Sequence, residues 1–133
     1  MISRMKRTTP LAIAVLGSGK GSNCQSLIDA IVAGRLNARI VCVLSDVENA
    51  FILERARKHG ITAEYISAAP FKTKLDGEAE QRYIATLRRY ETINHTSYMA
   101  FNPQTGQYGY IIQDTNASDV FNGTNNVHYR SIP

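Results

Sequence analysis

The chain has 133 residues, a formal net charge of +4 at pH 7 and two cysteines, Cys24 and Cys42. This length suits one domain, which buries about two-thirds of its unfolded surface and needs no disulfide. No apolar run approaches the ~20 residues of a membrane span. The apolar run at residues 11–16 is also shorter than the apolar region of a secretion signal, which has ~7 to 15 residues. The basic residues lie on predicted helix faces without an aromatic-interleaved stripe, so nucleic-acid binding is not predicted. We expect a cytoplasmic protein with no membrane contact, in which Cys24 is an ordinary packed thiol.

The first 31 residues predict a strand, a tight turn and a helix in direct succession. Residues 11–16 form a short, continuous apolar run, which is typical of a buried strand. A helix is predicted from residue 22 to about residue 32, because Leu27, Ile28 and Ile31 recur at helical spacing.

Strand and helix then alternate along the chain. Residues 38–44 predict a second strand, residues 50–59 a helix ended by a glycine, residues 63–66 a third strand and residues 77–90 a third helix. This alternation is typical of an α/β fold with right-handed crossovers. We therefore predict a Rossmann-like, doubly wound, three-stranded parallel sheet with flanking helices.

The composition changes after residue 90, where lysine disappears and Asn, Thr, Gly and aromatic residues become frequent. Residues 97–101 and 107–113 predict two strands of a β-hairpin, joined by a turn that contains Asn, Pro and Gly. The sequence after residue 113 carries too little periodicity for an assignment. We expect two units, a nucleotide-binding half-domain over residues 1–90 and a β-rich tail of unknown origin over residues 91–133.

The glycine-rich turn after the first strand predicts an anion site. Gly17, Gly19 and Gly21 permit a sharp turn and a close approach of the backbone to a ligand. Ser22 and Asn23 are favoured helix N-caps. Backbone N–H groups at a helix N-terminus, together with the positive end of the helix dipole, favour a phosphate.

Two other glycine-loop patterns compete for this turn. An ATP-type P-loop is not favoured, because two of its required positions hold other residues. The dinucleotide fingerprint fits better, since Gly17 and Gly19 match it and Ser22 stands where the third small residue belongs. Asp46, after the second strand, could hold a ribose hydroxyl. A dinucleotide-binding oxidoreductase therefore stays an alternative.

Three sequence blocks occur in an order that points to a known family: GSGKGSN at residues 17–23, SLIDAI at 26–31 and VLSDVENAFILERARKHGI at 43–61. In these blocks the chain resembles the N-terminal half of phosphoribosylglycinamide (glycinamide ribonucleotide) formyltransferases, over about residues 10–90. The resemblance implies a transferase of purine biosynthesis, which moves a formyl group from 10-formyltetrahydrofolate to the amine of glycinamide ribonucleotide, without a metal.

The resemblance also implies which residues hold the substrate phosphate. Gly19, Gly21, Ser22 and Asn23 would surround it at the glycine-rich turn. Lys74 lies in the loop after the third predicted strand, where the family has a basic residue, and would approach the same nucleotide. The expected partner is glycinamide ribonucleotide or another phosphorylated small molecule.

No catalytic residue is assigned, because the resemblance ends near residue 90. The family's next buried strand with its folate-binding loop, its Asn-x-His-Pro-Ser segment and its downstream acid have no counterpart in the sequence that follows. Formyl transfer needs groups that stabilise an oxyanion and manage a proton. We expect a truncated or chimeric chain that binds phosphate without efficient turnover. The alternative is a non-enzymatic nucleotide-binding or assembly module, which forms a homo-oligomer through the exposed sheet flank or the tail hairpin.

Overall fold

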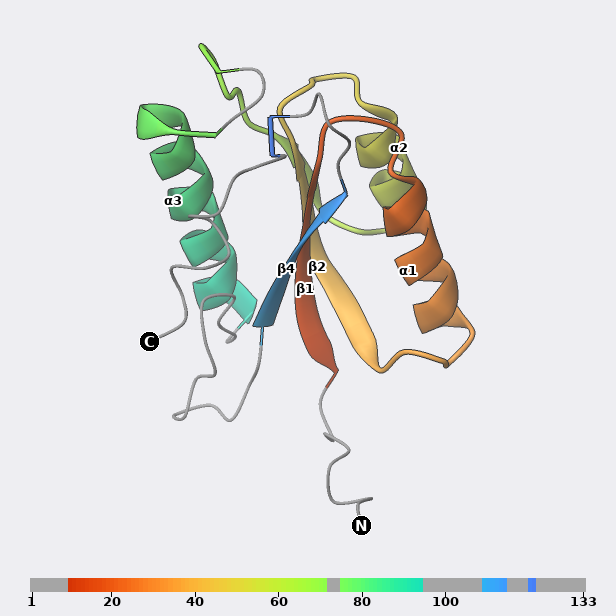
Figure 1. Cartoon of the computed structure of the whole chain (residues 1–133). Helices are drawn as coiled ribbons and strands as arrows, with labels where there is room; N and C mark the ends of the chain where they lie inside the picture. Colours follow the sequence, from red (N-terminus) through yellow and green to blue (C-terminus); the bar gives the residue numbers. More distant parts are fainter. Residues whose placement is uncertain (1–9, 72–74, 95–108, 115–119, 122–133) are drawn as a thin grey trace.

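The computed structural model describes residues 10–71, 75–94, 109–114 and 120–121. Its elements in chain order are β1 (Leu11–Gly17), α1 (Ser22–Val32), β2 (Ala38–Ser45), α2 (Phe51–Lys58), β3 (Ala63–Tyr65), α3 (Gly77–Asn94) and β4 (Gly109–Asp114). Figure 1 shows α1 and α2 on one face of the sheet and α3 on the other face. The predicted α/β, Rossmann-like fold class is therefore confirmed.

The described sheet has four parallel strands in the order β3-β2-β1-β4, whereas three were predicted. The additional strand, β4, lies beside β1 from the pair Ala12↔Gly109 to the pair Gly17↔Asp114. The sequence predicts residues 107–113 as one arm of a hairpin, whereas β4 pairs with β1. The sequence could not show this pairing, because a strand pattern identifies an extended segment but does not identify its partner. The other predicted arm, residues 97–101, lies outside the described residues.

The core lies on both faces of the sheet, as the nearly continuous apolar strands predict. In β1, Ala12, Ala14 and Leu16 pack on the side of α3. Ile13 and Val15 point to the opposite side, where α1 and α2 cover them. Because side chains alternate along a strand, β1 contributes to both halves of the core and occupies an inner position in the sheet.

The α3 side of the core includes residues from the C-terminal part of the chain. The Tyr83 hydroxyl donates a hydrogen bond to the Ile66 carbonyl oxygen at 2.6 Å. The Tyr83 ring meets the Phe121 ring edge-on, with centroids 5.3 Å apart and planes at 75°. Val120 and Phe121 are both fully buried. The proposed domain boundary at residue 90 stays a prediction, although these residues and β4 pack with the first part.

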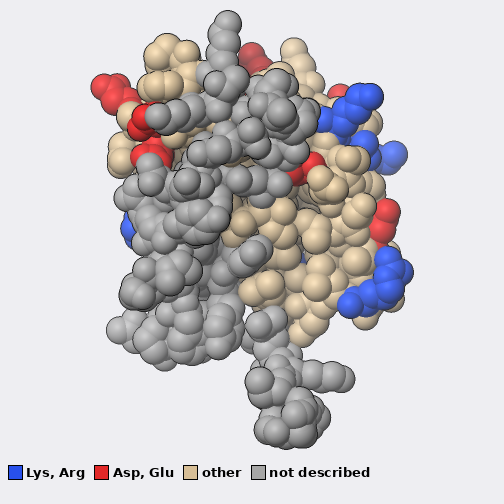
Figure 2. Space-filling model, viewed as in Figure 1, with Lys and Arg blue, Asp and Glu red and all other residues tan. Residues whose placement is uncertain are grey.

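The flank of β1 that was expected to be exposed is paired with β4, so β3 and β4 are the outer strands of the described sheet. Homo-oligomer formation stays a prediction. Among the described residues, no helix combines the length and apolar character that a membrane crossing demands. Figure 2 shows that most visible Lys and Arg side chains lie on the side of α1 and α2.

Candidate functional site

The glycine-rich loop lies at the carboxyl end of β1, where the direction of the strand order changes. From β1 the chain continues through α1 to β2, while β4 lies on the other side of β1. Figure 1 shows the helices α1 and α3 on opposite faces of the sheet. In open α/β sheets, ligands bind at this switch point, outside the carboxyl ends of the strands.

The three glycines of the loop have different roles. A Cβ atom on Gly21 would lie 2.5 Å from Cγ1 of Ile52, and the residue has a φ of 76°. A Cβ atom on Gly17 would lie 2.7 Å from Cδ1 of Ile52 and 2.8 Å from the Asp114 carbonyl oxygen. A Cβ atom on Gly19 would meet no atom of the described residues within 4 Å. Packing therefore requires glycine at two positions, while Gly19 leaves open space beside the loop.

The N-cap of α1 is Gly21, which corrects the prediction that Ser22 or Asn23 fills this position. The cap has a left-handed backbone, which strains residues other than glycine. Ser22 and Asn23 form the exposed first turn of the helix instead. Their backbone N–H groups donate to no atom of the described residues. The structure therefore brings the predicted residues Gly19, Gly21, Ser22 and Asn23 together around free helix donors.

A buried carboxylate from the end of β4 contacts the same helix terminus. Oδ2 of Asp114 accepts a hydrogen bond from the Cys24 backbone N–H at 2.7 Å. Oδ1 of Asp114 accepts one from the Asn23 side-chain amide at 3.1 Å. A carboxylate is favourable here because it meets the positive end of the helix dipole. Asp114 therefore takes one of the four unsatisfied first-turn N–H groups of α1 and brings a negative charge close to the others.

Helix α2 holds the loop from the opposite side. The Ile52 backbone N–H donates to the Gly19 carbonyl oxygen at 3.0 Å. Nε of Arg55 donates to the Lys20 carbonyl oxygen, and one of its terminal nitrogens donates to Oε1 of Gln25 at 3.1 Å. These contacts fix two loop carbonyl groups, so the loop backbone is held before any ligand arrives.

Two further residues named in the sequence analysis have different outcomes. The Ser18 hydroxyl donates to Oδ1 of Asp46 at 2.5 Å. Asp46 therefore fastens the loop to the end of β2, a role that explains the residue without a ribose ligand. Lys74 lies outside the described residues, so its place near a nucleotide stays a prediction.

Cys24 is a packed thiol, in agreement with the sequence analysis. Its side chain is buried, and burial followed by the nearby Asp114 charge raises the pKa of the thiol from 9.0 to about 11, against a smaller lowering by Arg55. A raised pKa leaves little thiolate near neutral pH. Because the thiolate is the nucleophilic form, we expect the Cys24 thiol to be unreactive at this site.

The site contains residues that sequence reasoning did not find, Asp114 and Ile52 above all. The sequence contained a signal for Asp114, because this acidic residue directly follows a predicted strand. It therefore lies at the carboxyl end of that strand, where ligand-binding sites of α/β sheets form. Ile52 carried no such signal, since its contact with the loop depends on how α2 packs. No group of three or more metal-ligating side chains occurs within the ranges that the structure describes.

The sheet order and the glycine-rich loop together define a Rossmann-like α/β protein with a candidate anion site at its switch point. Residues 11–105 match the model of the formyl transferase family. The chain belongs to this family, and the resemblance found in the sequence is confirmed.

The curated relatives agree with this assignment. The chain is 40% identical over 79 residues to the phosphoribosylglycinamide formyltransferase of Schizosaccharomyces pombe, which covers 57% of this chain and 38% of the relative. It is 40% identical over 62 residues to the Escherichia coli protein of the same name, which covers 47% of this chain and 29% of the relative. The chain thus spans less than two-fifths of the length of these relatives.

Solved structures show the same fold. Glycinamide ribonucleotide transformylase 1 from Symbiobacterium toebii superimposes with a TM-score of 0.55 at 32% identity, over 63% of this chain and 39% of that chain. The phosphoribosylglycinamide formyltransferase from Brucella melitensis gives a TM-score of 0.52 at 29% identity, over 61% of this chain and 41% of that chain. These matches favour a formyltransferase-like protein over a dinucleotide-binding oxidoreductase.

Proposed function

We propose that the loop over residues 17–23 binds the phosphate of glycinamide ribonucleotide, as part of a phosphoribosylglycinamide formyltransferase-like protein of purine biosynthesis. The observation that carries the proposal is the pair of first-turn N–H groups at Ser22 and Asn23, which have no partner among the described residues and lie near Gly19. Such groups bind phosphate at helix N-termini. The names of the relatives supply the choice of ribonucleotide.

We propose binding without efficient turnover for this chain. Formyl transfer needs one group that stabilises the tetrahedral oxyanion and another that accepts the proton of the attacking amine. In this proposal the loop N–H groups bind the phosphate, so they are not available to the oxyanion, and an N–H group does not accept a proton. We also propose that 10-formyltetrahydrofolate, which the resemblance implies, is the formyl donor of this family. We propose a cytoplasmic location for the protein.

The binding test is calorimetric titration of the full chain with glycinamide ribonucleotide. An Asn23→Asp variant places a negative charge in the first turn of α1, and we expect it to weaken binding by about tenfold or more. Asp29→Asn is a control for altered charge on the same helix, since Asp29 is exposed and lies outside the loop. Equal affinities for wild type and Asn23→Asp contradict the proposed site.

The turnover test is separate. The chain is mixed with glycinamide ribonucleotide and 10-formyltetrahydrofolate, and the loss of the formyl donor is followed spectroscopically. We expect no loss above the rate without protein. Turnover that Asn23→Asp abolishes would show that catalytic groups lie elsewhere in the chain and would overturn the proposal of binding alone.

A further inference from the structure

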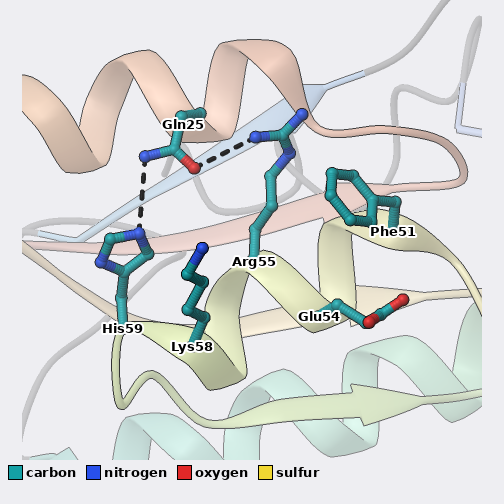
Figure 3. A pocket seen from close by; sticks show the side chains of 6 residues that line it. All are labelled: Gln25, Phe51, Glu54, Arg55, Lys58 and His59. Atoms are coloured by element: carbon teal, nitrogen blue, oxygen red, sulfur yellow. Dashed lines mark hydrogen bonds between the residues drawn. The ribbon is translucent and has the colours of Figure 1, made fainter.

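A second candidate site lies between α1 and α2. It is a pocket of about 540 Å³ lined by Gln25, Phe51, Glu54, Arg55, Lys58 and His59 (Figure 3). Pockets that hold small molecules commonly have volumes of about 300 to 1,000 Å³. None of the lining residues belongs to the loop over residues 17–23, although Arg55 also donates a hydrogen bond to the Lys20 carbonyl oxygen of that loop.

One wall of the pocket is a flat, fixed surface. Phe51 at the start of α2 is 48% exposed, although it is a large apolar residue. The Arg55 guanidinium carbon lies 4.6 Å from the centre of its ring. Bonds to the Gln25 side chain and the Lys20 carbonyl hold this guanidinium in place. Because the stacked pair is fixed, a planar ring can pack against it at a small additional entropy cost.

The pocket lining carries two full positive charges, Arg55 and Lys58, and one negative charge, Glu54. Lys58 is exposed and has neither an ion pair nor a hydrogen bond with the residues that the structure describes. His59 approaches Gln25, with Nε2 of each 3.5 Å apart. Figure 3 shows the Glu54 side chain directed away from Lys58, Gln25 and His59. The C-terminus of α2 adds about half a negative charge, which the full charges of Lys58 and Arg55 exceed.

We propose that the pocket between α1 and α2 binds a small organic anion in which a planar ring is joined to an oxyanion group, such as a nucleoside monophosphate. The ring packs on the pair formed by Phe51 and Arg55, and the oxyanion meets Lys58 and His59. The ligand class follows from a flat surface made by an aromatic ring and a guanidinium, with Lys58 and His59 in the same pocket. This inference does not rest on the proposed function of the glycine-rich loop.

The test uses adenosine monophosphate as the probe, with adenosine and inorganic phosphate as its two parts. Calorimetry gives the affinities, and backbone amide shifts in NMR spectra locate the site. We expect the monophosphate to bind more tightly than either part and to shift the amides of Gln25, Phe51 and His59. Lys58→Glu should weaken its binding by about tenfold or more.

Arg57→Glu is the matched control, because Arg57 is an exposed neighbour on α2 that does not line the pocket. It should change the affinity by less than about twofold, since exposed charges are screened by salt. Asn23→Asp should leave monophosphate binding at this pocket intact. The proposal is overturned if no binding occurs, if Lys58→Glu and Arg57→Glu act equally, or if one part binds as tightly as the whole probe. Loss of binding in Asn23→Asp alone would place the probe at the loop and would overturn it as well.

Discussion

At the scale of single residues, the stability of the loop depends on glycine at position 21 but not at position 19. Gly21 combines a left-handed backbone with a close approach to Ile52, while Gly19 has open space around it. We expect Gly21→Ala to lower the free energy of unfolding by about 2 kcal/mol or more, through strain and displacement of Ile52. Gly19→Ala should change it by less than about 0.5 kcal/mol. Urea unfolding measures both, and equal losses would contradict the packing role of Gly21.

Asp114 should affect stability and anion binding in opposite directions. Asp114→Asn removes a charge that accepts bonds from the Cys24 amide and the Asn23 side chain. The free energy of unfolding should fall by about 1 to 2 kcal/mol. The affinity for glycinamide ribonucleotide should rise by about tenfold, because a negative charge beside the phosphate is removed. Urea unfolding and calorimetry give the two values, with Asp29→Asn as the control. Unchanged affinity would show that Asp114 does not oppose the ligand.

Cys24 should be unreactive in the folded chain. Its thiol is buried, with its pKa raised from 9.0 to about 11, so alkylation near pH 8 should be about 100-fold slower than in the urea-unfolded chain. The rate in the folded chain should keep rising toward pH 11, whereas the unfolded thiol levels off above about pH 9. Mass spectrometry of peptides separates Cys24 from Cys42. Equal rates in folded and unfolded chains would contradict the buried thiol.

At the scale of elements, α3 makes an aromatic contact with the C-terminal part of the chain. Phe121 is fully buried and meets Tyr83 edge-on. We expect Phe121→Ala to lower the free energy of unfolding by about 3 kcal/mol or more, because it leaves a cavity. Tyr83→Phe removes the hydroxyl bond to the Ile66 carbonyl and should cost about 1 to 2 kcal/mol.

Ile93→Ala is the control for this contact, because Ile93 lies on the same helix and is 62% exposed. It should change the stability by less than about 0.5 kcal/mol. Urea unfolding compares the three variants. A Phe121→Ala variant as stable as Ile93→Ala would show that the residues after α3 contribute little to this core.

At the scale of the whole molecule, β4 covers one edge of β1 and brings Asp114 to the loop. A chain that ends after residue 94 loses this strand, and an exposed inner strand pairs readily with other chains. We expect this shortened chain to be less stable and to self-associate. Size-exclusion chromatography with light scattering measures its mass beside the full chain. A stable monomer would instead support residues 1–90 as an independent unit.

The sequence by itself determined the α/β class and the succession of β1, loop and α1, and it predicts an anion site at that loop. It could do so because periodicity and turn residues act over a few neighbouring residues. Only the tertiary structure decided the partner of β4, the contact of Ile52 with Gly21 and the bond from Cys24 to Asp114, which joins residues 90 positions apart. A hydrophobic pattern specifies which face of a helix or strand is buried. The packing of the whole chain decides which residues contact that face and which strand pairs with each edge.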